Sequence, residues 1–206
     1  MRVAGLDPSL SCTGYARPDG SVVRIPSSTD HPTLDRIDSI DRALGRLVSP
    51  PDRLDTSSGR ARMVPDPARP ELVVVEGFGG AGRGREAGLK ITGLGTVLRL
   101  RVWRAGIPLF EVAPATLKAY ATGNGRADKR AMREAYAERL RPTIPDRPLD
   151  VGHDEIDALW LRDVGLWLNY PASALLYAGP HEGTDRAILG RLCAGFDAVD
   201  RPAARS

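Results

Sequence analysis

The chain has 206 residues, of which 42% are hydrophobic and 27% are charged, and its formal net charge is +3. This is enough for one globular domain with its own core, and the composition excludes collagen-like, coiled-coil and fully disordered proteins. No apolar run approaches the roughly 20 residues that span a bilayer, no signal-peptide pattern opens the chain, and the two cysteines supply neither a disulfide framework nor a zinc-site spacing. We therefore expect a protein of the reducing cytoplasm that does not enter membranes.

The first part of the chain alternates short apolar strands with one amphipathic helix. Residues 2–7 predict a buried strand ending at Asp7, and a turn sequence at 17–20 joins expected strands at 12–16 and 21–25. Three further elements are expected here: a helix over 33–48, a proline-rich loop or insertion over 49–70, and a buried strand over 72–76 that ends at Glu76.

The second part is richer in helices. The patterns predict, in order, a glycine-rich loop at 77–88, a helix at 89–105, a strand at 107–112, helices at 114–120 and 128–140, a proline-rich loop at 141–151 and an apolar helix at 154–168. This order indicates an α/β domain over residues 1–170, a mixed sheet flanked by helices on both faces. A tail of unknown role follows over 171–206, with a candidate helix near 185–196.

Charge is distributed unevenly along the chain. Residues 61–141 carry 15 basic and 8 acidic side chains, a net of +7, whereas residues 142–206 carry 6 and 10, a net of −4. A basic segment beside an acidic one indicates a polyanion-binding surface next to a carboxylate-rich site. The alternative is an ordinary solvated surface in a protein that prefers arginine, since it has only three lysines.

Four acids occupy informative positions. Asp7 and Glu76 each end an apolar strand, and ligands gather at the carboxyl ends of strands in an open α/β sheet. Asp154 and Asp157 lie three residues apart at the start of the last apolar helix and share one helix face. Each also has a structural interpretation: a turn or salt-bridge residue for the first pair, and an N-cap with its N3 partner for the second.

Considered together, the four carboxylates favour a metal site. Clustered carboxylates repel and raise each other's pKa unless cations neutralise them. Oxygen ligands suit Mg²⁺ or Mn²⁺ rather than Zn²⁺, and two such ions about 4 Å apart are the usual arrangement for phosphodiester hydrolysis. The pattern therefore indicates a two-metal nuclease.

At this point the sequence resembles a known family, the RuvC-type Holliday junction resolvases of the RNase H-like superfamily. The resemblance runs in order through five motifs, at residues 5–15, 74–76, 110–118, 123–129 and 154–159. It implies an RNase H-like fold and a homodimer that cleaves four-way or other branched DNA. It also implies two Mg²⁺ ions per active site, for which Mn²⁺ may substitute, held by Asp7, Glu76, Asp154 and Asp157.

The same resemblance assigns residues that would contact DNA. Lys118 would approach the scissile phosphate or support the site electrostatically. Lys129, with the neighbouring Arg126, would contact the backbone near the site. Phe78 is the aromatic available to insert into a junction, although it could equally be a hydrophobic plug. His153 is an alternative metal ligand to Asp154, because it lies four residues from Asp157.

A basic segment from Arg83 and Arg85 to Arg104 could bind phosphates in the arms of branched DNA. It could also form part of a dimer interface, since several of its apolar residues have helical spacing: Leu89, Leu94, Val97, Leu98 and Val102.

Three other functions remain open from the sequence. One is a catalytically idle module that binds branched DNA, and another is an RNase H-like nuclease acting on RNA-containing duplexes. A third is an actin-like sugar kinase or ATPase, which also opens with a Gly-x-Asp strand but normally needs a second large lobe. The predicted function is a metal-dependent, structure-selective endodeoxyribonuclease.

Overall fold

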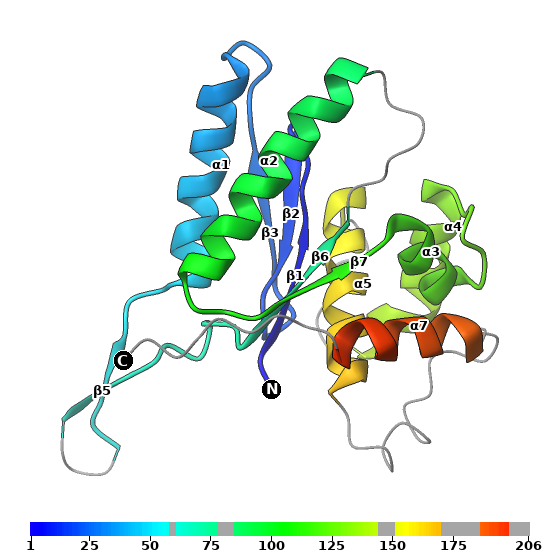
Figure 1. Ribbon diagram of the computed structural model, residues 1–206. Coiled ribbons are helices and arrows are strands. Elements are labelled where there is room, and N and C mark those ends of the chain that lie inside the picture. The colour runs from blue at the N-terminus through cyan, green and yellow to red at the C-terminus, as the bar shows by residue number, and fades with distance from the viewer. Residues whose placement is uncertain (58–60, 78–84, 144–150, 170–185, 198–206) are drawn as a thin grey trace.

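The computed structural model describes residues 1–57, 61–77, 85–143, 151–169 and 186–197 (Figure 1). Its centre is a five-stranded mixed sheet with the strand order β3-β2-β1-β6-β7. The first three strands are antiparallel neighbours, whereas β1, β6 and β7 run parallel. The strands are β1 Val3–Asp7, β2 Cys12–Ala16, β3 Val22–Pro26, β6 Leu72–Glu76 and β7 Leu109–Val112.

Helices cover both faces of this sheet, as predicted. Helices α1 (Thr33–Val48) and α2 (Arg85–Arg104) pack together on one face. The other face carries α3 (Pro114–Thr122), α4 (Lys129–Ala135), α5 (His153–Leu168) and α7 (Arg186–Asp197). No helix in the described part of the chain is long and apolar enough to cross a membrane.

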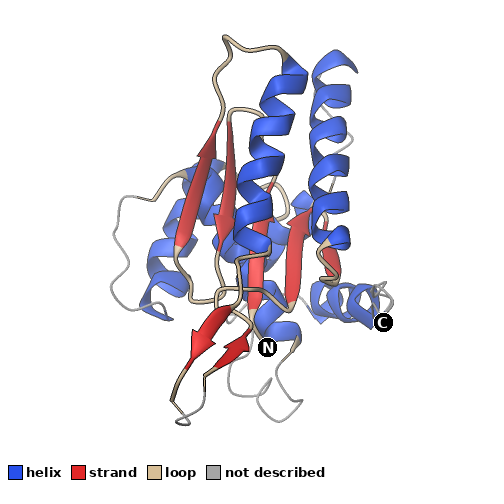
Figure 2. Cartoon of the chain, turned by 90° about the vertical axis from the view of Figure 1, so that its left-hand side faces the viewer, coloured by secondary structure: helices blue, strands red, loops and turns tan. Residues whose placement is uncertain are grey.

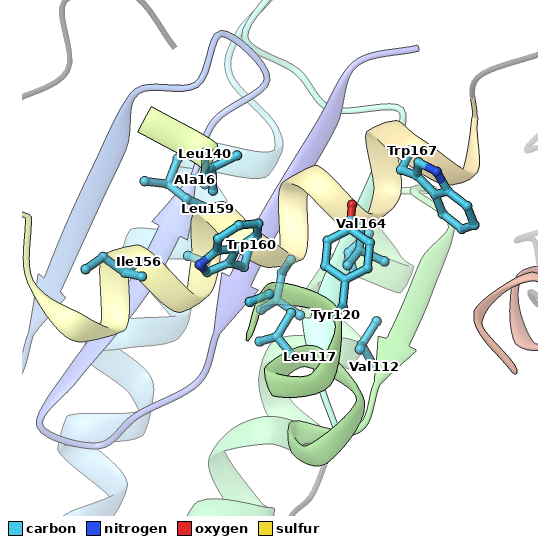
Figure 3. Packing of buried hydrophobic residues seen from close by; sticks show 14 of the residues in the cluster. Ala16, Val112, Leu117, Tyr120, Leu140, Ile156, Leu159, Trp160, Val164 and Trp167 are labelled. Atoms are coloured by element: carbon cyan, nitrogen blue, oxygen red, sulfur yellow. The ribbon is translucent and has the colours of Figure 1, made fainter. Parts of the chain in front are cut away.

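The core is divided in two because strand side chains alternate between the faces of the sheet. On β1, Ala4 and Leu6 pack with α1 and α2, whereas Val3 belongs to the cluster under α5. That second cluster is built around Tyr120, Trp160 and Trp167, which lie side by side with aliphatic side chains of β7 and α3 (Figure 3). The acids Asp7 and Glu76 follow directly after Leu6 and Val75, the last members of one cluster on β1 and β6.

Helix α5 lies unusually close to the sheet. A Cβ atom on Gly5 would stand 1.9 Å from the carbonyl oxygen of Ala158, and one on Gly14 would stand 2.0 Å from the carbonyl oxygen of Asp154. Real side-chain atoms do not approach this closely, so only glycine permits the contact at these two strand positions. The first turns of α5 are thereby brought against β1 and β2.

The structure differs from the sequence prediction in several segments. Helix α2 begins at Arg85, within the glycine-rich loop predicted over 77–88. The segment that follows α1 also differs. Residues predicted as a loop form a second, two-stranded sheet of β4 (Arg53–Asp55) and β5 (Arg62–Val64), which Figure 2 shows standing away from the main sheet. Leu54 and Met63 face each other across it and are both about three-fifths exposed. Each of these strands is only three residues long, too short for the alternation over four to eight residues by which strands are recognised.

The predicted helix over 128–140 is divided. Helix α4 starts after its N-cap Asp128, whose side chain accepts a hydrogen bond from the amide of Ala131 at 2.9 Å. A π-helical turn (Tyr136–Leu140) and a 3₁₀ turn (Arg141–Thr143) follow it. The candidate helix of the tail is present as α7, and its Leu192 is buried in the same cluster as Trp167.

Candidate active site

Two neighbouring parallel strands place the first two acids side by side. Strands β1 and β6 are in register as far as Leu6 and Val75, and Asp7 and Glu76 are the next residues of each strand. By strand alternation both side chains lie on the face covered by α5, the face of Val3 and Val74. Asp7 is only 6% exposed.

Helix α5 supplies the other two acids. Its N-cap is Gly152, whose amide donates a hydrogen bond of 2.5 Å to the carboxylate of Glu155. The capping interpretation of Asp154 and Asp157 is therefore wrong, because the carboxylate that caps the helix belongs to their neighbour Glu155. Both aspartates instead line the cleft between α5 and the strand ends.

This cleft has a volume of about 810 Å³ and combines acids, bases and hydroxyl groups. The predicted catalytic residues that line it are Asp7, Glu76, Lys118, Asp154 and Asp157, together with Lys129 and His153. Sequence elements far apart in the chain, from residue 7 to residue 157, thus meet in one place.

The acids of the cleft raise one another's pKa. Burial raises the pKa of Asp7 well above its ordinary value, and the nearby Glu76, Asp157 and Asp154 raise it further. Burial and the charges of Glu76 and Asp154 raise the pKa of Asp157 to about 7, against the opposing effect of Lys118 and Lys129. Asp7 and Asp157 thus ionise less readily than an exposed aspartate.

The donor set fits divalent cations. It consists of carboxylate oxygens that line the cleft, and oxygen is the ligand atom that Mg²⁺ and Mn²⁺ prefer. Among the described residues, no group of three or more His, Cys, Asp and Glu side chains is arranged so that it could hold a metal ion without moving. A hydrogen bond to Glu76 also contributes to the raised pKa of the Asp7 carboxyl group.

Known proteins resemble this chain over nearly its whole length. It is 31% identical to the crossover junction endodeoxyribonuclease RuvC of Salinispora arenicola over 206 residues, which covers 92% of this chain and 98% of the relative. The corresponding RuvC of Sorangium cellulosum is 30% identical, with 87% and 92% covered. The chain belongs to the RuvC family.

Two solved structures share the fold of this RuvC-family protein. The Thermus thermophilus RuvC structure superposes with a TM-score of 0.54 at 20% identity, covering 79% of this chain and 91% of that one. The structure titled T. thermophilus RuvC in complex with Holliday junction substrate has a TM-score of 0.55 at 19% identity, with 78% and 89% covered. No protein-family model matches the chain.

The residues predicted to contact DNA lie in different parts of this RuvC-family structure. Lys129 lies in the cleft, whereas Arg126 is exposed on the loop between α3 and α4 and does not line it. Phe78 and Arg83 fall outside the described residues, and so does the side chain of Arg85, the first residue of α2.

His153 lies in the cleft beside Asp154. Burial lowers its pKa, and the positive charges of Arg133 and Lys129 lower it further. A neutral imidazole keeps a nitrogen lone pair for a metal, so the alternative ligand remains compatible with the geometry.

Part of the predicted basic segment is engaged inside the protein. Arg101 donates to Asp41 through Nε at 2.8 Å and also through Nη2, which ties α2 to α1. Leu94, Leu98 and Val102, the apolar residues suggested for a dimer interface, are fully buried against the sheet and are not available to a partner. On the same helix, Leu89, Leu100 and Trp103 are exposed.

Sequence reasoning missed several polar residues of the cleft, among them Ser9, Ser11 and Thr92. The two serines could have been found, because they directly follow Asp7 in the first motif. Their loop is held by hydrogen bonds of Thr13 Oγ1, which donates to the carbonyl of Ser9 at 2.8 Å and accepts from its amide at 3.2 Å. Arg99, which also lines the cleft, was expected only as one arginine of the basic segment between residues 83 and 104.

Proposed function

We propose that this protein is a divalent-metal-dependent endonuclease that resolves Holliday junctions by two-metal phosphodiester hydrolysis. The observation that supports it best is the gathering of Asp7, Glu76, Asp154 and Asp157, from three separate elements, around one cleft that also holds two lysines. A structural role would not need four partly buried acids whose charges oppose folding.

Each group has a distinct role in the proposal. Asp7, Glu76, Asp157 and either Asp154 or His153 would hold two Mg²⁺ ions, with Mn²⁺ as a substitute. When bound, the ions supply charge neutralisation at the phosphate and lower the pKa of the attacking water.

The two lysines act on the substrate directly. Lys118 on α3 is partly buried at the cleft and would donate to an oxygen of the scissile phosphate, adding a compact positive charge where negative charge develops. Lys129, exposed at the start of α4, would hold the neighbouring backbone phosphate. Ser9 and Ser11 also line the cleft and offer hydroxyl donors.

Two further parts of the proposal concern assembly and substrate. The relatives are named crossover junction endodeoxyribonucleases, and one fold neighbour was solved with a Holliday junction. A four-way junction has near two-fold symmetry, so a two-fold dimer would present one active site to each of two equivalent strands. The exposed apolar residues of α2, Leu100 and Trp103, are our candidate for the dimer contact.

Asp7→Asn tests the proposal. We expect the variant to bind a four-way junction but to cut it more than about 100-fold more slowly at saturating Mg²⁺, because it removes a direct ligand and not merely a supporting group. The matched control is Asp38→Asn on α1, an exposed acid paired with Arg42, which should cleave like the wild type.

The substrate is tested on the wild-type protein with a junction, a flap, a plain duplex and an RNA–DNA hybrid of one sequence. Preferential, symmetric nicking of the junction supports the proposal. Wild-type cleavage by Asp7→Asn would contradict the metal site, and preference for the hybrid would make the protein an RNase H-like enzyme acting on RNA.

A further inference from the structure

The end of β6, where Glu76 lies, has an interrupted hydrogen-bond ladder. The amides of Val73 and Gly77 donate to Pro108 and Val112, on the β7 side, at 3.0 and 2.8 Å. The amide of Leu72 donates to Arg2, on the β1 side, at 3.3 Å. Even-numbered residues of β6 therefore bond to β1 and odd-numbered residues to β7, the alternation of a parallel sheet.

In this register the carbonyl of Glu76 faces the backbone nitrogen of residue 8. Leu6 and Val75 are the last paired residues of β1 and β6. The next amide of β1 that could donate to β6 would therefore be that of residue 8. Residue 8 is a proline, which has no N–H. The ladder therefore ends one bond early, directly at an acid-bearing residue.

Arg99 of α2 supplies a donor at this position. Its Nη2 donates to the backbone carbonyl of Glu76 at 2.8 Å. The same guanidinium donates through Nε to the carboxylate of Glu111 at 2.6 Å and through Nη1 to the carbonyl of Gly95 at 3.0 Å. One side chain thus joins α2, the end of β6 and β7.

The protein around Arg99 holds its side chain in this position. The Arg99 side chain is only 13% exposed although it borders the cleft, and its charge is balanced by Glu111 rather than by the acids of the site. A planar guanidinium with donors in fixed directions can satisfy three acceptors at once, which the single ammonium of lysine cannot do in the same geometry.

We infer that Arg99 is a positioning residue: it replaces the hydrogen bond that Pro8 cannot make and so fixes the backbone from which the Glu76 carboxylate reaches the metals. The inference rests on the proposed function for what Glu76 holds. Arg99 is therefore not expected to bind DNA phosphates, because Nε, Nη1 and Nη2 each donate a hydrogen bond to a group of the protein.

The first test compares Arg99→Gln and Arg99→Lys with Arg101→Ala. Arg101 is the matched control. It is also an arginine of α2 held by hydrogen bonds, but its partner is the carboxylate of Asp41 and not the backbone of Glu76. Affinity for Mn²⁺ is measured by calorimetry in the absence of DNA, beside the thermal stability of each variant. We expect both Arg99 variants to bind Mn²⁺ roughly 10–100-fold more weakly, the usual effect of losing a group that orients a metal ligand, and Arg101→Ala to lose stability with near wild-type affinity.

Wild-type Mn²⁺ affinity in both folded Arg99 variants would overturn the inference. So would an equal loss in Arg101→Ala, because the effect would then come from weakened packing of α2 in general.

A second measurement does not depend on the metal. Hydrogen exchange of the Gly77 amide, which bonds to Val112 at the end of β6, reports how well this strand end is held. Exchange should accelerate at least about tenfold in Arg99→Gln but not in Arg101→Ala, and adding Pro8→Ala, which restores an N–H at residue 8, should slow it again. Unchanged exchange in Arg99→Gln contradicts the inference, even if the wild-type protein binds Mn²⁺ and cleaves junctions. If the wild type does neither, the proposed function fails, while the exchange result still decides the role of Arg99.

Discussion

The fold raises the pKa of the Asp7 and Asp157 carboxyl groups, so both ionise at a higher pH than an exposed aspartate. Burial is the main cause for each, and the neighbouring acids of the cleft add to it. A carboxylate in this position is unfavourable by itself and becomes favourable when a cation shares the site. Metal binding and proton release at the cleft should therefore be coupled.

This coupling has a definite direction with pH. The pKa of Asp157 is raised to about 7 from an ordinary value of 3.8, so its protonated form stabilises the metal-free fold at low pH, and this stabilisation is lost as the pH rises through about 7. We expect the melting temperature without metal to fall between about pH 5.5 and pH 8. Added Mg²⁺ should raise it more at the higher pH.

Scanning calorimetry of the wild type and Asp157→Asn checks this expectation. The variant should show a weaker pH dependence without metal and a smaller response to Mg²⁺. A Mg²⁺ effect of the same size at both pH values, unaffected by the substitution, would contradict the assigned role of Asp157.

A second residue-scale prediction concerns the core below the site. The hydroxyl of Tyr120, which is 1% exposed, donates to Asp163 at 2.8 Å, and burial raises the pKa of that carboxyl. Tyr120→Phe would leave the carboxylate without this donor, so it should lower the free energy of unfolding by about 1.5–3 kcal/mol. The measurement is urea unfolding.

Tyr15→Phe is its matched control. Tyr15 is also fully buried, but its hydroxyl has no hydrogen-bond partner among the described residues. Removing this hydroxyl should cost little or nothing. Equal losses in the two variants would show that the Tyr120–Asp163 hydrogen bond contributes nothing specific.

At the scale of elements, the contact of α5 with the sheet decides whether the site forms. Gly14 pairs with Asp7 across β1 and β2 and touches the carbonyl of Asp154, so one residue sets the separation between two acids of the cleft. Gly14→Ala should both destabilise the fold and weaken Mn²⁺ binding, because Cβ would displace the backbone on which Asp154 stands.

The control for this variant is Gly190→Ala on α7, where a Cβ meets nothing within 4 Å. It should stabilise the fold by about 0.5–1 kcal/mol, the usual gain for alanine inside a helix. Melting temperature and Mn²⁺ affinity are measured on both. Unchanged Mn²⁺ affinity in a folded Gly14→Ala protein would refute the role of this close approach.

The sequence predicted the elements that carry strong periodic patterns. Strands β1 and β6 could be recognised with their terminal acids, because both are apolar runs buried on two faces. It could not show which acid caps α5, because Asp154, Glu155 and Asp157 are equally plausible caps in the sequence. The structure shows that the helix is capped at Gly152, which makes Glu155 the capping carboxylate at N3. The role of Arg99 depends on a contact 23 residues from Glu76, for which one sequence carries no signal.

At the scale of the whole molecule, assembly should depend on the outer side of α2. Leu100 and Trp103 are 43% and 39% exposed on that helix, an unfavourable arrangement for a monomer unless a partner covers them. Leu100→Glu combined with Trp103→Glu should convert a dimer to a monomer in light scattering. Each monomer should keep its Mn²⁺ affinity but lose paired nicking of a junction.

Leu54→Glu is the control for this substitution. Leu54 is more exposed, at 61%, but lies on the hairpin of β4 and β5, away from α2. It should leave the oligomeric state unchanged. A wild-type protein that is monomeric, or an α2 variant that stays dimeric, would contradict this choice of interface.

The central claim is that the acids of the cleft together bind divalent cations. Anomalous diffraction from crystals soaked in Mn²⁺ tests this claim most directly. We predict two anomalous peaks about 4 Å apart, in contact with carboxylate oxygens of Asp7, Glu76 and Asp157 and completed by Asp154 or His153. An empty cleft at a Mn²⁺ concentration that supports cleavage, or ions bound elsewhere on the protein, would contradict the account.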